Sequence, residues 1–532
     1  MFDNMAASGG GRGSVRRAAR LIDAGWWPRM RARAGDRWFV PAAVLVAAGC
    51  FVVSVWNTWN VPFEGDEAAT LAVIRMPWGR LMSFAWTRTD AVHVVFYGVA
   101  KAWAGVFGQS ELGMRSLVCL ALSAAVFVTV MVGRELRGPL TGLVAGVLLV
   151  FMPRAVWGTL LARSYTLSML LAVSMVWVLL VAVRRGRWGW WLAWAGVCAV
   201  CVWVYAYSLL LVPVEVLYAW GRRAKPARAL MAGGVVVVSS LPLAWVVFAQ
   251  GRSAWFAGRP VGWSKTMIEP FFVSVDTAGV LGWVLVAGGL AGLAWSGLRG
   301  DRPWPDRLRD LCGNPLGLTA GLVVVPLAGL RVVDWWWFPV FYPNYLPYCV
   351  PAFALALALA GAAMKDRPLA IVALAVIVVL TLPWMASQKT YGSTHRGTGW
   401  GPTRDLVTAQ ALPGDCLVTS QAGPRVRNPS RGVLVYRADY ARLRDLSLVQ
   451  VSQDADSFYD TRRPVADAVA GKPCARLWFI APADQTVDGP LDAKSRLLRE
   501  QEQDQIAEHG YTLMRSWDVT ATQIQLYEDK DK

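Results

Sequence analysis

The sequence predicts an all-α polytopic membrane protein that ends in a C-terminal α/β domain, and three observations indicate this fold class. Hydrophobic residues make up 55% of the 532 residues and charged residues only 17%, whereas a soluble protein carries about 25% charged residues. Apolar runs long enough to cross a bilayer recur through roughly the first 390 residues. After them the chain becomes polar, and strand-like and helix-like patterns alternate.

The formal net charge of +17 is concentrated in short segments between the apolar runs. Lys and Arg in such short loops mark the cytoplasmic side of a membrane protein, where they face anionic lipid headgroups. The basic character therefore indicates contact with the lipid bilayer, and we expect no nucleic acid among the partners.

The N-terminal segment, residues 1–38, is basic and lacks the pattern of a cleaved signal peptide. We expect this tail to be cytoplasmic and the first apolar run to remain as an anchor in the plasma membrane. The basic loops then predict a transmembrane domain over residues 39–386, with about 11 helices and with the C-terminus outside. The expected spans are residues 39–57, 115–133, 138–152, 166–183, 188–205, 207–220, 229–248, 278–297, 315–331, 345–363 and 367–385.

Residues 58–114 are expected to form one long outer loop with interfacial helices. Residues 92–108 within it are apolar enough to be considered as a span, but Lys101 lies at their centre. A span here would also move the basic segment "RELRG" to the outside. We therefore predict an amphipathic helix in the membrane interface.

Residues 387–532 contain no spanning run and are expected to form an extracytoplasmic α/β domain. The predicted strands are "CLVTS", "GVLVYRA", "LSLVQVS", "ARLWFIAP" and "QIQLYE", and the predicted helices are "TRDLVTAQAL", "ADYARLRDL" and "SRLLREQEQDQIAEHG". Cys416 and Cys474 each open a strand, and disulfides persist outside the cell. Neighbouring strands would bring them within bridging distance, about 4.4–6.8 Å between Cα atoms. Two separate buried thiols are the alternative.

The segment "FEGDEAATLAV", residues 63–73, places three acids shortly after the first expected span. Acids near hydrocarbon are costly and usually have a function. Asp66 could cap the helix that follows, with Glu67 in its first turn against the helix dipole. A cap also fixes a carboxylate in place, so this role is compatible with Asp66 accepting a proton from a substrate hydroxyl as a general base.

Further outer-loop residues are candidates for substrate binding. The motif "RTDAVHVVFY" places Asp90, His93 and Tyr97 on one helix face, although an N-cap Asp beside an interfacial His and Tyr would look the same. One His near a few acids is weak evidence for a metal site. Arg163, before the span 166–183, either clamps a phosphate with its guanidinium or snorkels to the interface. The remaining candidates are Tyr165, Lys265, Asn344 and Tyr345.

The order of these elements resembles the GT-C glycosyltransferases. The resemblance rests on the acidic "DE" after the first span, a second Asp in a long outer loop, and the segments "LGMRSLVCLALSAA", "GRELRGPLTGLVAGVLL" and "ARSYTLSMLLAV". It covers about residues 39–390 and is strongest for the branch that resembles protein mannosyltransferases and other polyprenyl-phosphate-sugar transferases, glycosyltransferase family 39. The tail has no such resemblance.

The resemblance implies that a sugar moves from a polyprenyl-monophosphate donor to an acceptor, usually with inversion. It implies that Asp66 is the base, that Glu67 binds hydroxyls and that Arg163 contacts the leaving phosphate. Related chains often begin a late helix with an "RY" pair, whereas this chain has Asn344 before Tyr345. A cation is therefore missing there, and Lys265 or Arg331 are candidates to replace it. Arg or Lys can stabilise a monophosphate without a bridging metal, so we expect no obligatory cofactor, with a divalent metal as an option.

Mannose is the favoured sugar under this resemblance. Arabinofuranose competes, because the Trp-, Arg- and Ala-rich composition is typical of a high-GC actinobacterium with a glycolipid-rich envelope. The expected acceptor is an extracytoplasmic lipoglycan, wall polymer or protein. Two other classes stay open: a lipid-linked sugar flippase or transporter, and a non-catalytic wall-assembly protein. The acids lie in loops, and the sequence shows no internal repeat, which argues against a transporter.

Overall fold

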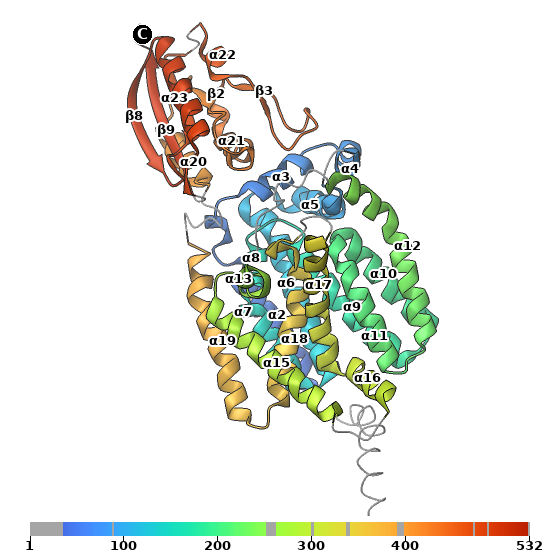
Figure 1. The fold of residues 1–532 in the computed structure, drawn as a ribbon. Coiled ribbons are helices and arrows are strands. Elements are labelled where there is room, and N and C mark those ends of the chain that lie inside the picture. Colours follow the sequence, from blue (N-terminus) through green and yellow to red (C-terminus); the bar gives the residue numbers. More distant parts are fainter. Residues whose placement is uncertain are drawn as a thin grey trace, which may run out of the picture.

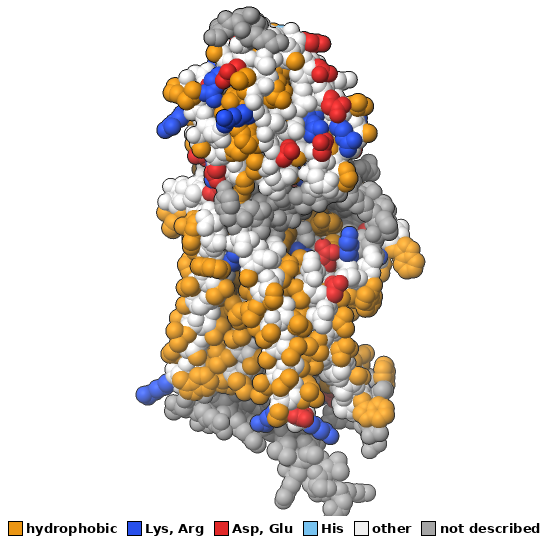
Figure 2. All heavy atoms as spheres, turned by 90° about the vertical axis from the view of Figure 1, so that its left-hand side faces the viewer, with side chains coloured by type: hydrophobic (Ala, Val, Ile, Leu, Met, Phe, Trp, Pro, Cys, Tyr) orange, Lys and Arg blue, Asp and Glu red, His pale blue; other side chains and the backbone are white. Residues whose placement is uncertain are grey.

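The computed structural model describes residues 36–87, 90–251, 262–298, 303–336, 341–390, 398–471, 474–486 and 489–529. Its elements form a helical bundle and, at one end of it, a C-terminal domain with a five-stranded sheet (Figure 1). Figure 2 shows apolar side chains over the bundle as a broad band, with charged side chains mainly on the C-terminal domain and at the opposite end. The chain is therefore a multi-pass helical membrane protein with a C-terminal α/β domain.

The helices of the bundle follow the expected spans. Seven of the described helices are long and apolar enough to cross a membrane, and the pair α7–α8, bent by 59°, makes an eighth. The other three expected spans correspond to shorter apolar segments, Trp188–Val204, Ala206–Gly221 and Pro347–Ala363. The seven long helices are α2 (Phe39–Val55), α6 (Glu111–Leu136), α9 (Tyr165–Arg185), α12 (Pro226–Gly251), α15 (Asp276–Leu298), α17 (Pro315–Trp336) and α19 (Arg367–Ser387).

Shorter elements complete the bundle, and some of them pack very closely. A Cβ on Gly142 would lie 2.3 Å from the Val130 carbonyl oxygen, so a glycine is needed where α7 touches α6. These elements are α7 (Pro139–Phe151), α8 (Pro153–Thr159), α10 (Trp188–Val204), η5 (Ala206–Leu211), α11 (Val212–Gly221), α13 (Trp263–Met267), α14 (Glu269–Phe272), α16 (Trp304–Cys312), η6 (Pro343–Tyr345), η7 (Pro347–Cys349) and α18 (Val350–Ala363).

The segment between the first two long helices forms a layer of short helices at the end of the bundle that faces the C-terminal domain (Figure 1). Lys101 of this layer donates hydrogen bonds from Nζ to the carbonyl oxygens of Ile74 and Met76, both at 2.7 Å. Its helix is thus tied to neighbouring elements of the layer. The elements of the layer are η3 (Thr58–Asn60), α3 (Gly65–Ile74), α4 (Trp78–Thr87), η4 (Ala91–His93) and α5 (Val94–Phe107).

The C-terminal sheet has the strand order β2-β1-β5-β9-β8. Strand β1 is parallel to both β2 and β5, whereas β9 is antiparallel to β5 and β8. Its strands are β1 (Cys416–Thr419), β2 (Arg444–Asp445), β5 (Arg476–Pro482), β8 (Tyr511–Val519) and β9 (Thr522–Asp529). Two small ladders accompany it: β3 (Leu448–Gln450) with β4 (Thr461–Arg462), and β6 (Gln485–Thr486) with β7 (Gly489–Pro490).

Both faces of the sheet are covered, because side chains alternate along the buried strand β5. Leu477 and Phe479 pack in one cluster with α22 (Val465–Val469) and α23 (Ala493–Glu508). Trp478 packs in a different cluster, with α20 (Trp400–Gln410) and α21 (Pro429–Val435).

This second cluster also extends into the layer of short helices. Leu71 of α3 and Phe96 of α5 belong to the same buried cluster as Trp400, Leu434 and Trp478 of the C-terminal domain. The C-terminal domain therefore shares a hydrophobic core with the layer between the first two long helices.

The tail differs from the predicted pattern in three places. Residues "GVLVYRA" were predicted as a strand but lie largely in α21, because Pro429 suits the first turn of a helix and Asn428 caps it by accepting from the Ser430 N–H at 2.9 Å. Residues "ADYARLRDL" form only the short turn η9 (Asp439–Arg442) before β2. Strand β8 was not predicted, since most of its side chains are exposed and the apolar alternation is weak.

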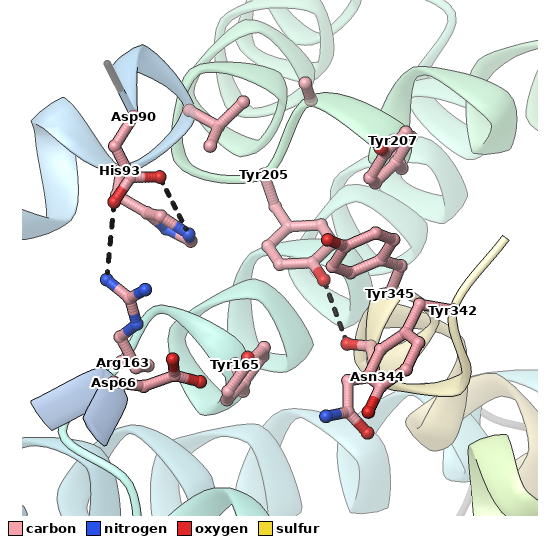
Figure 3. A pocket seen from close by; sticks show the side chains of 12 residues that line it. Asp66, Asp90, His93, Arg163, Tyr165, Tyr205, Tyr207, Tyr342, Asn344 and Tyr345 are labelled. Atoms are coloured by element: carbon pink, nitrogen blue, oxygen red, sulfur yellow. Dashed lines mark hydrogen bonds and ion pairs between the residues drawn. The ribbon is translucent and has the colours of Figure 1, made fainter. Parts of the chain in front are cut away.

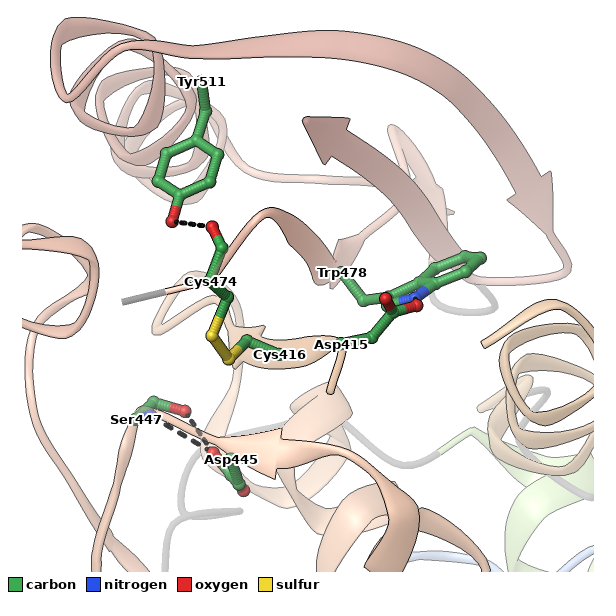
Figure 4. The surroundings of a disulfide bond; sticks show 7 residues. All are labelled: Asp415, Cys416, Asp445, Ser447, Cys474, Trp478 and Tyr511. Atoms are coloured by element: carbon green, nitrogen blue, oxygen red, sulfur yellow. Dashed lines mark hydrogen bonds between the residues drawn. A yellow bond between two sulfur atoms is a disulfide. The ribbon is translucent and has the colours of Figure 1, made fainter. Parts of the chain in front are cut away.

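A disulfide joins Cys416 to Cys474, with their Cα atoms 6.1 Å apart (Figure 4). Cys416 opens β1 opposite Leu477 of β5, so the bridge links the starts of two paired strands. Tyr511 Oη donates to the carbonyl oxygen of Cys474 at 2.8 Å and holds the second half of the bridge. The pairing matches the neighbouring strands that the sequence pattern suggested.

Candidate active site

A cavity of about 270 Å³ lies where α3, η4, the loop before α9, η5 and η6 meet. Figure 3 shows two groups of side chains around it. We call Asp66, Asp90, His93 and Arg163 the charged wall. The tyrosine wall consists of Tyr165, Tyr205, Tyr207, Tyr342 and Tyr345. Seven of the nine catalytic and substrate-binding residues expected from the sequence line this cavity, whereas Glu67 and Lys265 do not. The lining residues are Asp66, Asp90, Val92, His93, Arg163, Tyr165, Tyr205, Ala206, Tyr207, Tyr342, Asn344 and Tyr345.

Asp66 is the second residue of α3, and the N-cap is Glu64 rather than Asp66 as expected. The backbone N–H of Glu64 donates to Glu67 Oε2 at 3.2 Å, which is half of a capping box. The half-buried Asp66 carboxylate points into the cavity (Figure 3), and among the described residues it forms no hydrogen bond or ion pair. It is therefore available to accept a proton from a ligand.

Glu67 is fully buried below the cavity surface. Arg115 of α6 donates from Nη2 to Glu67 Oε2 at 2.6 Å and from Nε to Oε1 at 2.9 Å. Oε1 also accepts from the Ala162 N–H at 3.0 Å. Arg115 further donates to the carbonyl oxygens of Thr58 and Pro62, at 2.9 and 3.0 Å. The expected contact of Glu67 with substrate hydroxyls does not fit this position, because α6 supplies a partner that the local sequence does not reveal.

This buried ion pair fixes two parts of the charged wall relative to each other. Asp66 precedes Glu67 in α3, and Arg163 follows Ala162 in the loop between α8 and α9. Thr70 of α3 adds a second tie by donating from Oγ1 to the Ala162 carbonyl oxygen at 3.1 Å. Removing one partner of a buried pair typically costs about 3–5 kcal/mol of stability. Glu67 is thus placed to position Asp66 and Arg163.

Asp90 is the centre of the charged wall. Its backbone is left-handed, with φ at 72°, a conformation that is uncommon for a non-glycine residue and is often found at functional sites. Tyr97 Oη donates to Asp90 Oδ2 at 2.5 Å, and Arg163 Nη1 lies 3.6 Å from the same oxygen. His93 Nε2 lies 3.7 Å from Oδ1. The side chains of Asp90, His93 and Tyr97 therefore lie together, as expected from the sequence.

Burial and neighbouring charges set the protonation of this cluster. Burial lowers the pKa of His93 to about 4, with Arg163 acting in the same direction and Asp90 opposing it. His93 is therefore neutral at neutral pH, and its Nδ1 lies 3.1 Å from Ser164 Oγ. Burial alone would raise the pKa of Asp90, but Arg163 and the hydrogen bond from Tyr97 favour the ionised carboxylate and lower this pKa. The wall thus holds an ionised carboxylate beside a cation.

Arg163 lies in the wall of the cavity and is only 8% exposed, so it does not snorkel to the surface. Its Nη1 donates to Tyr97 Oη at 2.8 Å. Its Nε is buried and has no hydrogen-bond partner among the described residues. The guanidinium therefore keeps donor capacity for an anionic ligand, as a phosphate clamp requires.

The tyrosine wall is a chain of aromatic rings. Tyr207 and Tyr345 stack at 5.3 Å between ring centroids, and Tyr342 lies 5.8 Å from Tyr345. Tyr205 lies 6.4 Å from Tyr165 and 6.2 Å from Tyr207. These spacings are within the usual range for aromatic pairs. The wall offers an amphipathic surface to whatever fills the cavity.

Asn344 is held by an arginine that the sequence analysis missed. Arg154 of α8 donates from Nη1 to Asn344 Oδ1 at 2.7 Å and from Nη2 to the Glu269 carbonyl oxygen at 2.6 Å. Its guanidinium lies over the Trp157 ring at 4.6 Å and is only 1% exposed. The only signal in the sequence is an Arg directly after Pro153 at a break in an apolar run.

The two basic residues suggested in place of the absent "RY" arginine lie elsewhere. Lys265 is exposed on α13, outside the cavity. Arg331 forms an ion pair with Asp334 at 2.7 Å. The cation nearest to Asn344 is instead Arg154, through the hydrogen bond to its side chain. Within the described ranges, no group of three or more His, Cys, Asp or Glu is arranged to hold a metal ion.

Fold and site together define a multi-pass membrane protein with a polar cavity next to a C-terminal α/β domain. The chain is similar to ArnT from Cupriavidus metallidurans in the apo state, with a TM-score of 0.52 and 13% identity over 93% of this chain and 98% of that one. It therefore has the GT-C fold.

Two further solved structures are less similar. The oligosaccharyltransferase of Archaeoglobus fulgidus has a TM-score of 0.47 and 10% identity over 90% of this chain and 73% of that one. The mycobacterial arabinofuranosyltransferase AftD has a TM-score of 0.45 and 16% identity over 93% of this chain and 40% of that one. The sequence matches no protein-family model and no curated protein.

Proposed function

We propose that the protein is a glycosyltransferase that moves a sugar from a polyprenyl-monophosphate donor to an extracytoplasmic acceptor hydroxyl. The observation that carries the proposal is the cavity that holds the carboxylate of Asp66 together with the buried guanidinium of Arg163. Such a transfer needs a base at the acceptor and positive charge at the leaving phosphate. The GT-C fold supports the same class of reaction.

In the proposed reaction, Asp66 takes the proton of the acceptor hydroxyl as its oxygen attacks the anomeric carbon. The bond from that carbon to the phosphate oxygen breaks, and the polyprenyl phosphate leaves with the electron pair. Attack from the face opposite the phosphate inverts the configuration. Arg163, held by Asp90 and Tyr97, faces the charge that develops on the phosphate. We propose that no cofactor is obligatory, so that transfer persists in a metal chelator.

The size of the cavity supports a monosaccharide as the transferred group. Its volume of about 270 Å³ lies just below the range of about 300–1,000 Å³ typical of ligand pockets. The tyrosine wall and Asn344 are the proposed contacts of the sugar ring, because aromatic faces pack on its C–H groups while amides bind its hydroxyls. Mannose is our favoured sugar and arabinofuranose its competitor, with a lipoglycan, wall polymer or protein as acceptor.

We further propose that the basic end of the bundle is cytoplasmic and that the C-terminal domain is extracytoplasmic, in the plasma membrane. Two exposed arginines make a matched pair of reporters, Arg187 at the basic end and Arg442 in the C-terminal domain. In a Cys312→Ser background, Arg442→Cys should react with an impermeant maleimide in intact cells, whereas Arg187→Cys should react only after permeabilisation. The reverse pattern would overturn this orientation.

The function itself is tested with purified protein in detergent and a panel of polyprenyl-phosphate sugars. The expected result is release of polyprenyl phosphate together with glycosylated acceptor, abolished by Asp66→Asn. A flippase, a transporter or a wall-assembly scaffold would show no turnover of any donor. If Asp66→Asn turns over like the parent, the protein is still a glycosyltransferase, but Asp66 is not its general base.

A further inference from the structure

Asn344 lines the cavity from a short segment whose backbone is restrained. Pro343 precedes it in η6 and Pro347 begins η7, so the φ angle is fixed at two positions of this stretch. Tyr205 Oη donates to the Asn344 carbonyl oxygen at 3.0 Å. Asn344 is only 7% exposed and is one of the residues around the cavity (Figure 3). Its side chain therefore meets a ligand with little freedom to move.

The direction of the Asn344 amide follows from its partner. An amide side chain has an oxygen that accepts and an NH2 group that donates, whereas arginine has donors only. Arg154 Nη1 lies 2.7 Å from Asn344 Oδ1. Oδ1 must face Arg154, because the turned amide would set two donors against each other. Arg154 is not among the residues that line the cavity, so Oδ1 is directed away from a ligand.

The Nδ2 group of Asn344 is the part of the amide that is left for a ligand. It forms no hydrogen bond in the described part of the chain, and it is not sealed off from solvent, in contrast to Nε of Arg154. The amide thus presents a donor to the cavity and no acceptor. The guanidinium bound to Oδ1 also polarises the amide and strengthens Nδ2 as a donor. A group of this kind binds an oxygen lone pair, such as that of a sugar hydroxyl.

Arg154 is a costly residue at its position. It is 1% exposed, its Nε is buried without a hydrogen-bond partner, and it forms no ion pair within the described ranges. Its other contacts are the Trp157 ring at 4.6 Å and Glu269, which offers the backbone carbonyl oxygen at 2.6 Å from Nη2 and not the carboxylate. Burial of a cation without a direct counter-ion is destabilising. A methionine would pack on Trp157 without this cost, so packing alone does not account for the charge.

We propose that Arg154 is a positioning residue that fixes Asn344 as a donor-only contact for one hydroxyl oxygen of the transferred sugar. The site then selects a neutral hydroxylated sugar over an analogue that carries an amino group at the same carbon. A protonated amine would bring donors and positive charge against the Asn344 NH2 group and the Arg154 cation behind it. This inference rests on the proposed transferase function of the cavity and names the class of sugar that the cavity accepts.

The first test compares Asn344→Asp with the parent, as purified full-length proteins, on polyprenyl-phosphate sugars in which one ring hydroxyl at a time is replaced by hydrogen or by an amino group. In the parent, either replacement at one ring position should raise KM by about 10- to 100-fold. Aspartate keeps the contact with Arg154 but loses the donor, so the amino sugar at that position should become the better substrate, with kcat nearly retained. Asn60→Asp, the same change at an exposed position, should keep the parental ranking of sugars.

The second test separates the orientation of the amide from the contact itself. Without the guanidinium of Arg154 the amide can turn and offer Oδ1 to the cavity, so Arg154→Met should accept hydroxyl and amino sugars about equally. Arg154→Lys still donates to Oδ1 and should restore the preference of the parent. Arg442→Met, which removes an exposed arginine of the C-terminal domain, should leave the preference unchanged.

Thermal unfolding adds a readout that needs no substrate. Asn344→Asp should have a Tm at or above that of the parent, because its carboxylate supplies the counter-ion that Arg154 lacks. A clearly lower Tm would show that Oδ1 does not face Arg154 and would overturn the inference.

Two kinetic outcomes would also overturn it: the parental ranking of sugars in Asn344→Asp, or an equal loss of rate on every sugar in Arg154→Met, which indicates a structural role alone. If Arg154→Met does not elute as a folded monodisperse protein, the comparison of Asn344→Asp with the parent decides. Failure of the proposed function is recognised separately, because the parent would then turn over no donor of the series.

Discussion

The charged wall and the tyrosine wall of the cavity are held in place by different forces. Directed bonds hold the charged wall, from the Glu67–Arg115 pair beneath it to the contacts of Arg163 with Asp90 and Tyr97. Ring contacts connect the tyrosines of the tyrosine wall, and Tyr205 Oη donates a hydrogen bond of 3.0 Å to the Asn344 carbonyl oxygen. Directed bonds fix single atoms, as proton transfer requires, whereas ring packing shapes a surface. We therefore propose that the charged wall carries the chemistry and that the tyrosine wall binds the sugar.

The largest effect should come from Asp66→Asn. Loss of a general base lowers a rate by about 10²- to 10⁴-fold, and kcat should fall by this amount while donor binding is retained. Single-turnover assays with radiolabelled donor measure both quantities. Asp276→Asn, an exposed carboxylate at the start of α15, is the matched control with parental activity. A parental kcat in Asp66→Asn would end the assignment of chemistry to the charged wall.

A smaller loss is expected for Arg163→Lys. Lysine keeps the charge but loses the planar pair of donors. Hydrogen bonds to charged groups are worth about 1.5–3 kcal/mol, so turnover should fall by roughly 10- to 100-fold and approach that of Arg163→Ala. Inhibition by free polyprenyl phosphate should weaken in parallel. Full activity of the Lys variant would show that this position needs only a positive charge.

Substitutions in the tyrosine wall should act on binding instead of chemistry. Aromatic contacts are worth about 0.5–1.5 kcal/mol, so Tyr207→Ala should raise KM for the donor by about 2- to 10-fold with kcat nearly retained. The same variant should change the ranking of sugars in a donor panel. A collapse of kcat with unchanged KM would contradict the division between the walls.

The smallest expected effect concerns stability. The pKa of His93 is lowered to about 4 in the folded protein, whereas its value in the unfolded chain is near 6.5. Between pH 6.5 and 4, His93 is therefore protonated in the unfolded chain but neutral in the folded protein. Stability should therefore fall as the pH drops from 6.5 to 4, by up to about 3 kcal/mol from this group. Asp90 has a lowered pKa and contributes below this window.

Thermal unfolding in detergent measures this slope. His93→Gln should flatten the dependence of Tm on pH, and Tyr345→Phe in the tyrosine wall should leave it unchanged. An equal slope in the parent and in His93→Gln would mean that His93 is protonated in the folded protein.

Much of the fold was predictable, because hydropathy marks the spans and the basic loops indicate which polar residues gather at one end. The long-range partners were not. Glu67 is paired with Arg115, which lies 48 residues later in the chain. Asn344 is oriented by Arg154, which lies 190 residues earlier. Local patterns contain no signal for such pairs. The short helix at Pro429 was also missed, since its β-branched and apolar residues favour a strand until the cap at Asn428 is considered.

Lys389 ties the two ends of the membrane domain together. Its Nζ donates to the carbonyl oxygens of Ser54 and Trp56, at 2.8 and 3.2 Å, and to that of Val53. Asn57 returns the contact through the Lys389 carbonyl oxygen, across 332 residues of sequence. During synthesis the first span is inserted long before the ribosome reaches this lysine. The contacts of Lys389 with the carboxyl end of α2 can therefore form only after α19 has been synthesised.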